Sequence, residues 1–320
     1  MTAQSNLDTL VTIFGGSGFL GRHVVRALAK RHYRIRVAVR RPELAGHLQP
    51  LGRVGQIHCV QANIRNPASI NAMVHESDVV INLVGILFER GAQRFDTVQA
   101  EGAGAVARAA TQHGARMIHV SAIGADENSS SHYARSKGAG EHLVRLAAPN
   151  ATIFRPSIMF GPDDDFFNRF ASLARFSPFL PLVGGGATPF QPVFAGDVAE
   201  AIALAVDGRA AADAVYELGG PDVFTFKQLM AFVLATIERR RLLIPLPFAV
   251  AKLQAFFLQL LPKPLLTPDQ VELLKSDNIV SSGTMTLASL EIAPTPVEVI
   301  LPTYLDRFRR GGWSERRPRI

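Results

Sequence analysis

The first half of the chain alternates short apolar runs with longer stretches in which apolar residues recur at helical spacing. Short apolar runs predict buried strands, and the longer periodic stretches predict helices. The predicted strands are Leu10–Phe14, Ile35–Val39, Ile57–Gln61, Val79–Val84, Met117–Ser121 and Thr152–Phe154. The predicted helices are Phe19–Arg31, Gln99–Gln112 and Tyr133–Leu146. This alternation predicts right-handed βαβ units and an α/β fold, a doubly wound parallel sheet with both faces covered.

The pattern changes after Gly161, where proline and glycine become frequent. This change predicts a smaller, mixed carboxyl-terminal domain over 161–310, which follows the doubly wound domain over 8–160. Two later apolar stretches, Gln191–Phe194 and Val215–Leu218, are expected to return to the first domain's sheet. Residues 190–220 would then complete that sheet, and a basic tail over 311–320 would end the chain.

A second apolar region lies near the carboxyl terminus, between Pro247 and Pro262. At most 14 residues of helix fit between these prolines, which is too short to span a bilayer. Lys252, Gln254 and Gln259 are nearly the only polar positions, so the helix is either buried in protein or lies at an interface. The cluster Arg239-Arg240-Arg241 just before it favours a membrane surface or a membrane complex as partner. An ordinary core helix remains the other interpretation.

Composition excludes a disordered chain, because 48% of the 320 residues are apolar and the charge is mixed. The net charge of +7 comes largely from arginines after residue 306, and such a tail suits an anionic surface or remains solvated. We expect no nucleic-acid partner. The only cysteine, Cys59, lies in an apolar run and is predicted to be a buried structural thiol. The amino terminus shows no signal-peptide pattern, so we expect a cytoplasmic protein.

The strongest local signal is a glycine-rich turn between the first predicted strand and helix, Gly15-Gly16-Ser17-Gly18-Phe19-Leu20-Gly21. Gly15 permits a tight turn, Gly18 lets the backbone approach a pyrophosphate, and Gly21 allows close packing of the helix. The phosphates would then lie on the unpaired amides of the helix amino terminus. This turn predicts a Rossmann-type dinucleotide-binding domain, with its six binding positions at Gly15, Ser17, Gly18, Phe19, Leu20 and Gly21.

The end of the second strand favours NADPH over NADH as the cofactor. NAD-binding proteins usually carry an acid here for the ribose hydroxyls. This chain has Arg40-Arg41 and no acid before Glu43. Because a guanidinium pairs with phosphate through two parallel hydrogen bonds, Arg40 is predicted to bind the 2′-phosphate with support from Arg41.

Tyr133 and Lys137 form a Tyr-x-x-x-Lys pair, whose spacing places both side chains on one helix face. The lysine ammonium would lower the pKa of the phenol and bind the nicotinamide ribose, and the phenol could transfer a proton to a substrate oxygen. The glycine spacing and this pair resemble the short-chain dehydrogenase/reductase superfamily in its extended or atypical branches. Active members add a serine or threonine, and two registers stay open here: Ser121 could serve, whereas Ala122 could not.

Further contacts are implied by this resemblance alone. Asn63 and Ile64 would bracket the adenine, with Asn63 in place of the usual acid. The backbone at the end of the fourth strand, at Leu83, Val84 and Gly85, would pass beneath the cofactor ribose. Pro156 and Ser157, at the end of the sixth strand, would make further contacts with the cofactor. We expect no metal site, because the histidines lack zinc-ligand spacing and Asp163-Asp164-Asp165 suits a loop or a helix start.

Later stretches resemble one branch, the NADPH-binding accessory subunit of respiratory complex I (NADH:ubiquinone oxidoreductase) and its bacterial relatives. They are Arg155–Gly161, Ser129–Lys137 with Glu141, Phe166–Phe170, Gln191–Val193 and Leu290–Pro296. The resemblance implies tightly bound NADPH and a peripheral position on the inner face of the bacterial inner membrane, in contact with complex I subunits and the membrane surface. It leaves catalysis undecided. The alternative is a soluble NADP-dependent reductase, epimerase or dehydratase, or an accessory protein of quinone biosynthesis.

Overall fold

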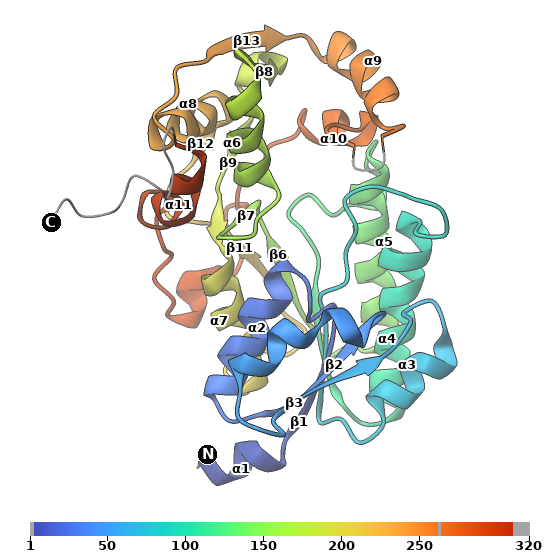
Figure 1. Ribbon diagram of the computed structural model, residues 1–320. Coiled ribbons are helices and arrows are strands. Elements are labelled where there is room, and N and C mark those ends of the chain that lie inside the picture. The colour runs from blue at the N-terminus through green and yellow to red at the C-terminus, as the bar shows by residue number, and fades with distance from the viewer. Residues whose placement is uncertain (1–2, 262–263, 310–320) are drawn as a thin grey trace, which may run out of the picture. The chain divides into compact units, whose positions relative to one another are not determined.

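The computed structural model describes residues 3–261 and 264–309, which fold into two compact units (Figure 1). Among the described residues, unit 1 comprises 3–156, 196–218 and 282–292, and unit 2 comprises 157–195, 219–261, 264–281 and 293–309. The basic tail expected over 311–320 lies outside the described residues. In the described part of the chain, no helix has the length and apolar character needed to cross a membrane.

Unit 1 is built on a seven-stranded parallel sheet with the strand order β11-β6-β5-β4-β1-β2-β3. The strands are β1 (Leu10–Phe14), β2 (Arg34–Val39), β3 (Ile57–Gln61), β4 (Val79–Asn82), β5 (Arg116–Val120), β6 (Thr152–Pro156) and β11 (Val215–Leu218). β1 and β4 are buried at every position, as a parallel sheet covered on both faces requires. The predicted α/β, doubly wound Rossmann-type fold is therefore confirmed.

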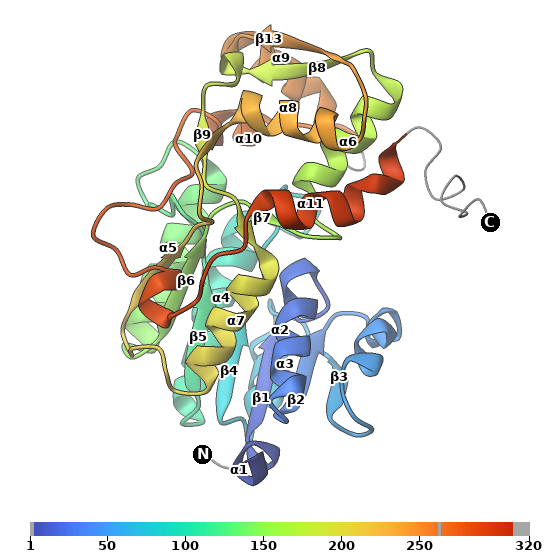
Figure 2. The same ribbon diagram turned by 90° about the vertical axis from the view of Figure 1, so that its left-hand side faces the viewer.

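Helices cover both faces of this sheet (Figures 1 and 2). One face carries α2 (Phe19–Lys30) and α7 (Ala195–Val206), and the other carries α3 (Pro67–Val74), α4 (Glu101–Gln112) and α5 (His132–Ala147). A short helix, α1 (Ala3–Asp8), precedes β1. Arg31 at the end of α2 pairs with Glu200 of α7 and with Asp207, which directly follows α7, so these two helices are held side by side.

A buried ion-pair network joins α5 to the strands at one edge of the sheet. The Arg155 guanidinium on β6 donates to both oxygens of Glu141 on α5, at 2.9 and 2.7 Å. Its third nitrogen lies 3.5 Å from Glu217 on β11. Both carboxylates are about 5% exposed, so each charge is compensated inside the protein and α5 is fixed relative to the strands.

Two expectations about the sheet differ from the structure. Val215–Leu218 does join the sheet as β11, but Gln191–Phe194 does not. Pro192 has no N–H to donate, and the amide side chain of Gln191 bonds to Gly220 and Val280 in unit 2 instead. Cys59 is half-buried where full burial was expected, because β3 is an edge strand. Burial still raises the pKa of its thiol.

Unit 2 contains three two-stranded sheets and four longer helices in the described residues. The strand pairs are β7 (Met159–Phe160) with β10 (Val193–Phe194), β8 (Phe179–Val183) with β13 (Leu242–Leu246), and β9 (Pro189–Phe190) with β12 (Phe224–Thr225). The longer helices are α6 (Phe166–Phe176), α8 (Phe226–Thr236), α9 (Phe248–Leu258) and α11 (Val297–Leu305), and a short one is α10 (Pro268–Leu273). Buried phenylalanines and leucines make up much of the core, among them Phe160, Phe167 and Phe226.

Asp164 caps the start of α6, as expected for the acidic run Asp163–Asp165. Its carboxylate accepts the backbone N–H groups of Phe167 and Asn168, at 2.6 and 3.2 Å. The hydroxyl of Tyr304 on α11 donates to the same carboxylate at 2.5 Å. Asp164 is buried, and burial raises its pKa to about 6.

We expect the stability of unit 2 to depend on pH through Asp164. Its pKa in the folded state lies above its ordinary value of 3.8, so its contribution is greatest below pH 3.8 and is lost as the pH rises through about 6. Asp164→Asn keeps a capping oxygen but cannot ionise. The free energy of unfolding of the native protein, measured relative to this variant by urea titration, should therefore fall between pH 4 and pH 7. A constant difference across that range would contradict the expectation.

Candidate functional site

The glycine-rich turn and the β4 loop meet where the strand order reverses, between β1 and β4. Gly15 has φ +82°, and a Cβ there would lie 3.1 Å from backbone atoms of both Leu83 and Val84. A Cβ at Gly21 would lie 2.5 Å from the backbone of Gly16. Both positions therefore require glycine, and ligands of doubly wound sheets bind at such a reversal of strand order.

The first turn of α2 presents unpaired backbone amides beside this turn. No side chain caps the helix, and Gly18 stands at the N-cap position. The only non-neighbouring atom within 4 Å of a Cβ placed on Gly18 is the carbonyl oxygen of Gly15, at 3.3 Å. Ser17 and Phe19 flank Gly18 and are half-buried, whereas Leu20 is buried in the core. The turn can thus present backbone N–H groups to an anion, which the macrodipole favours.

A pocket of about 360 Å³ opens at the carboxyl ends of β2 and β3. Its lining residues are Arg40, Gln61, Ala62, Asn63, Asn66 and Ser69. Arg40 and Asn63, predicted from separate parts of the sequence, are therefore brought together. Arg41 is exposed beside the pocket without lining it, and Ile64 packs toward Gly102 on α4.

The turn after β4 is fixed by a buried asparagine. Asn82 accepts the N–H of Val84 at 3.1 Å, and its amide nitrogen lies 3.3 Å from Nδ1 of His119 on β5. Gly85 follows, and a Cβ there would lie 3.4 Å from Nζ of Lys137 and 3.4 Å from Oε1 of Gln99. The β4 turn therefore lies directly against the lysine of the Tyr-x-x-x-Lys pair.

Lys137 is buried on α5 with its ammonium donating to the carbonyl of Val120 at 3.3 Å. Burial lowers its pKa to about 8, against the opposing effect of the Glu141 carboxylate. Tyr133 lies one helical turn earlier, half-buried, with its ring 5.9 Å from that of Phe95. The predicted pair thus occupies one face of α5 beside the carboxyl end of β5.

Ser121 follows β5 and carries a buried hydroxyl for which the described residues offer no hydrogen-bond partner. A buried hydroxyl without a partner costs free energy, so this oxygen is suited to a ligand group. Ala122, the alternative register, has no hydroxyl and is half-buried. Pro156 ends β6 and accepts the N–H of Ile123, whereas Ser157 lies in unit 2 and donates to the Oδ1 of Asn278 at 2.7 Å.

Sequence reasoning missed two polar residues of this site, Gln99 and His119. Gln99 accepts the N–H of Ile86 at 3.3 Å and donates to Ser136 at 2.9 Å, so it ties the β4 turn to α5. It belongs to a π-helical turn, Asp96–Ala100, whereas the sequence predicted that a regular helix begins at Gln99. His119 is fully buried, and its pKa is lowered to about 3, first by burial and then by the charge of Lys137. Both residues have apolar neighbours in the sequence, and such runs predict buried structure and give no signal for a site residue.

These features fit a dinucleotide. The glycine turn leaves room for phosphates, and the pocket holds a cation and three carboxamides for an adenosine end. Ser121, Tyr133 and Lys137 offer polar groups for the other end. Within residues 3–261 and 264–309, no three histidine, cysteine or acidic side chains gather as metal ligands.

Comparison with known proteins gives the same fold and a specific set of relatives. The model of the NAD dependent epimerase/dehydratase family matches residues 11–219. NADH dehydrogenase (ubiquinone) 1 alpha subcomplex subunit 9 of Arabidopsis thaliana is 36% identical over 97% of this chain and 80% of its own length. A ceramide reductase of Caulobacter vibrioides is 40% identical over 54% of each chain. An NADPH-dependent quinone oxidoreductase of Escherichia coli, solved with NADPH, superimposes with a TM-score of 0.71 at 20% identity, covering 89% of this chain and 96% of that one.

Proposed function

Since this chain belongs to the NAD dependent epimerase/dehydratase family and to the family of alpha subcomplex subunit 9 of NADH dehydrogenase (ubiquinone), we propose that it is an NADPH-holding accessory subunit of a respiratory complex I. The observation that carries this proposal is the 36% identity across 97% of the chain, which includes both units. The partners would be subunits of that complex, and the position would be peripheral, on the inner face of a bacterial inner membrane.

The residues of unit 1 would hold the nucleotide at both ends. Arg40 would bind the 2′-phosphate and Asn63 the adenine, the turn from Gly15 to Gly21 would hold the pyrophosphate, and Lys137 the nicotinamide ribose. A bound nicotinamide would supply or accept a hydride. In the accessory-subunit proposal the nucleotide instead serves as a ligand that binds only the folded state and so stabilises unit 1.

Purification under mild detergent tests the assembly proposal. The tagged protein should co-migrate on native gels with NADH dehydrogenase activity and should release NADPH only on denaturation, which fluorescence of the extract would measure. If the protein migrates alone and carries no nucleotide, both the assembly with a respiratory complex and the binding of NADPH are contradicted. The matched control is Leu146→Ser on α5, which alters an exposed side chain remote from the glycine turn in sequence and should change neither result.

A second function is favoured by one observation. Ser121, Tyr133 and Lys137 all lie at the carboxyl end of β5 and on the adjacent face of α5, which is the set that proton transfer to a substrate oxygen would need. The ceramide reductase relative is a reductase by name. This alternative is an NADP-dependent reductase, and NADPH oxidation with a carbonyl substrate that vanishes in Tyr133→Phe would establish it. We expect no such oxidation with common carbonyl or quinone acceptors.

A further inference from the structure

Helix α9 in unit 2 is apolar on its outward face as well as its inward face. Its inward face packs through Ala251 and Ala255, both fully buried, against Val271 of α10 and Val183 of β8. Alanines at this spacing let α9 lie close to its neighbours. Phe248 at the start of the helix also packs against this cluster, whereas most of the other large side chains of α9 lie outside the core.

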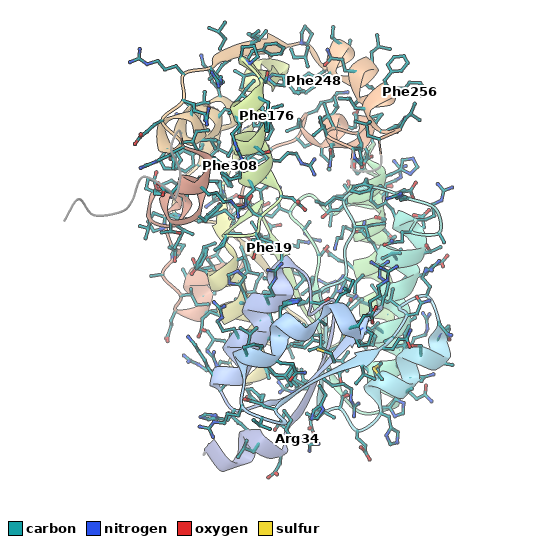
Figure 3. All side chains as sticks on the ribbon, in the orientation of Figure 1. Phe19, Arg34, Phe176, Phe248, Phe256 and Phe308 are labelled. Carbon is teal, nitrogen blue, oxygen red and sulfur yellow. The ribbon has the colours of Figure 1, made fainter. Side chains whose placement is uncertain are left out.

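The outward face of α9 carries the larger side chains. Spacings of three and four residues place them on one side of the helix, and Figure 3 shows Phe256 on it. These side chains and their exposed fractions are Val250 (44%), Leu253 (62%), Phe256 (57%) and Phe257 (61%), and Leu260 (78%) in the turn after the helix continues them. Single exposed apolar residues are ordinary, but a contiguous group of this kind marks an interaction surface.

The exposed apolar surface extends along β13, the strand that leads into α9. Leu242 is 71% exposed and Ile244 is 42% exposed, and alternate residues of a strand share a face. Phe179 of β8, paired with Leu242 in the register, is 46% exposed. We call these residues together with the outward face of α9 the apolar rim of unit 2.

Three arginines lie at the β13 end of the apolar rim. Arg175 at the end of α6 lies 5.5 Å from the ring of exposed Phe176, and Arg240 and Arg241 directly precede β13. The Arg241 side chain donates to the backbone carbonyls of Ala174 and Arg240. Among the described residues, none of these three arginines has a carboxylate within 4 Å, so their positive charges are not compensated. On α9, by contrast, Lys252 pairs with Glu272 at 3.6 Å.

We propose that the apolar rim of unit 2 inserts into the headgroup and acyl boundary of an anionic lipid bilayer, with Arg175, Arg240 and Arg241 on the phosphate layer. Aromatic and aliphatic side chains next to uncompensated cations are what such a surface attracts. A typical protein interface carries about ten hydrogen bonds, and the rim side chains offer no group for them, which favours a lipid surface. The proposal deepens the peripheral position proposed above and rests on it only for its biological setting, because vesicles alone can test it.

The test is co-sedimentation of the full chain with vesicles of phosphatidylcholine alone and with 30% phosphatidylglycerol. We expect binding to the anionic vesicles that weakens with salt. The double substitution Phe256→Ser with Phe257→Ser should lower the partition coefficient at least about tenfold. It removes two aromatic rings whose transfer from water into the bilayer would favour binding. The double substitution Arg175→Gln with Arg240→Gln should lower the partition coefficient by about fivefold for each arginine removed. This loss should occur with the anionic vesicles and not with phosphatidylcholine alone.

Matched controls distinguish binding by the apolar rim from nonspecific apolar binding and from nonspecific electrostatic attraction. Leu146→Ser changes a side chain that is 67% exposed in unit 1, and Arg34→Gln removes an exposed charge there; neither should alter partitioning. Thermal unfolding and NADPH binding verify that each variant is folded. Failure of the native protein to sediment with anionic vesicles would overturn the proposal, as would equal binding by the phenylalanine variant. A dimer in gel filtration that this variant dissociates, with no vesicle binding, would show that a second copy covers the rim. A failure of vesicle binding would not bear on the assembly proposal, because the native-gel experiment tests that proposal independently.

Discussion

Lys137→Ala should weaken NADPH binding by about tenfold to a hundredfold, the effect of losing a charged hydrogen-bond donor worth about 1.5–3 kcal/mol. The ammonium lies buried against the turn that follows β4, where Gly85 leaves space for it. The variant should also unfold at a lower temperature when NADPH is present, because weaker ligand binding stabilises the folded state less. Isothermal titration and thermal unfolding with and without the nucleotide measure both quantities.

The pH dependence of binding gives an independent measurement of the same lysine. Burial lowers the Lys137 pKa to about 8, so the ammonium is present below that pH and is lost above it. NADPH affinity of the native protein should therefore fall above pH 8, whereas that of Lys137→Ala should not follow this titration. Tyr133→Phe provides the comparison within the same helix face, since it removes at most one hydrogen bond of about 0.5–1.5 kcal/mol. Unchanged affinity in Lys137→Ala would mean that the nucleotide lies elsewhere.

Arg40→Ala should weaken NADPH binding about tenfold or more while leaving NADH binding nearly unchanged. The guanidinium lines the same pocket as Asn63, and only NADPH carries a 2′-phosphate for it to pair with. Titration of both nucleotides against the native protein and the variant gives the four affinities. The difference between the two nucleotides, rather than either value alone, isolates the phosphate contact.

Arg41→Ala is the matched control for this prediction. It removes the neighbouring positive charge, but Arg41 does not line the pocket, so its effect should be the smaller of the two. An equal loss in both variants would indicate general electrostatic attraction instead of a direct contact. If the native protein prefers NADH, or binds both nucleotides equally, the prediction is wrong that the lack of an acid after β2 favours NADPH.

The sequence predicted the sheet of unit 1 well because buried parallel strands are continuous apolar runs. β1 and β3 begin and end at the predicted residues, and the other predicted strands differ by at most two residues at either end. The convergence of Arg40 with Asn63 followed from strand order, since carboxyl ends of parallel strands share one edge. The motif-based contacts themselves stay predictions.

Other features depend on tertiary contacts that no local pattern reports. α3 has an Asn66 cap and a proline in its first turn, but it is short and was not predicted. Gln191–Phe194 has the composition of a strand, yet its partners lie in unit 2. Gln99 and His119 stand among apolar neighbours in the sequence, so only the fold reveals that Gln99 bonds to Ser136 and that His119 lies against Asn82. The apolar stretch after Pro247 left two interpretations open, and exposed fractions were needed to distinguish its faces.

The sheet of unit 1 draws its edge strand from a distant part of the chain, and this has a consequence for synthesis on the ribosome. When residue 156 has been translated, β6 can pair with β5, but its other edge has no strand, and Arg155 has Glu141 as partner but not yet Glu217. β11 emerges only after the first segment of unit 2, and Ser282–Ile292 later still. A nascent chain therefore exposes an unpaired strand edge while another unit is being made, the situation in which edge-to-edge association competes with folding. A fragment that ends after β6 should accordingly aggregate, even though it contains the whole glycine-rich turn and the Tyr133–Lys137 pair.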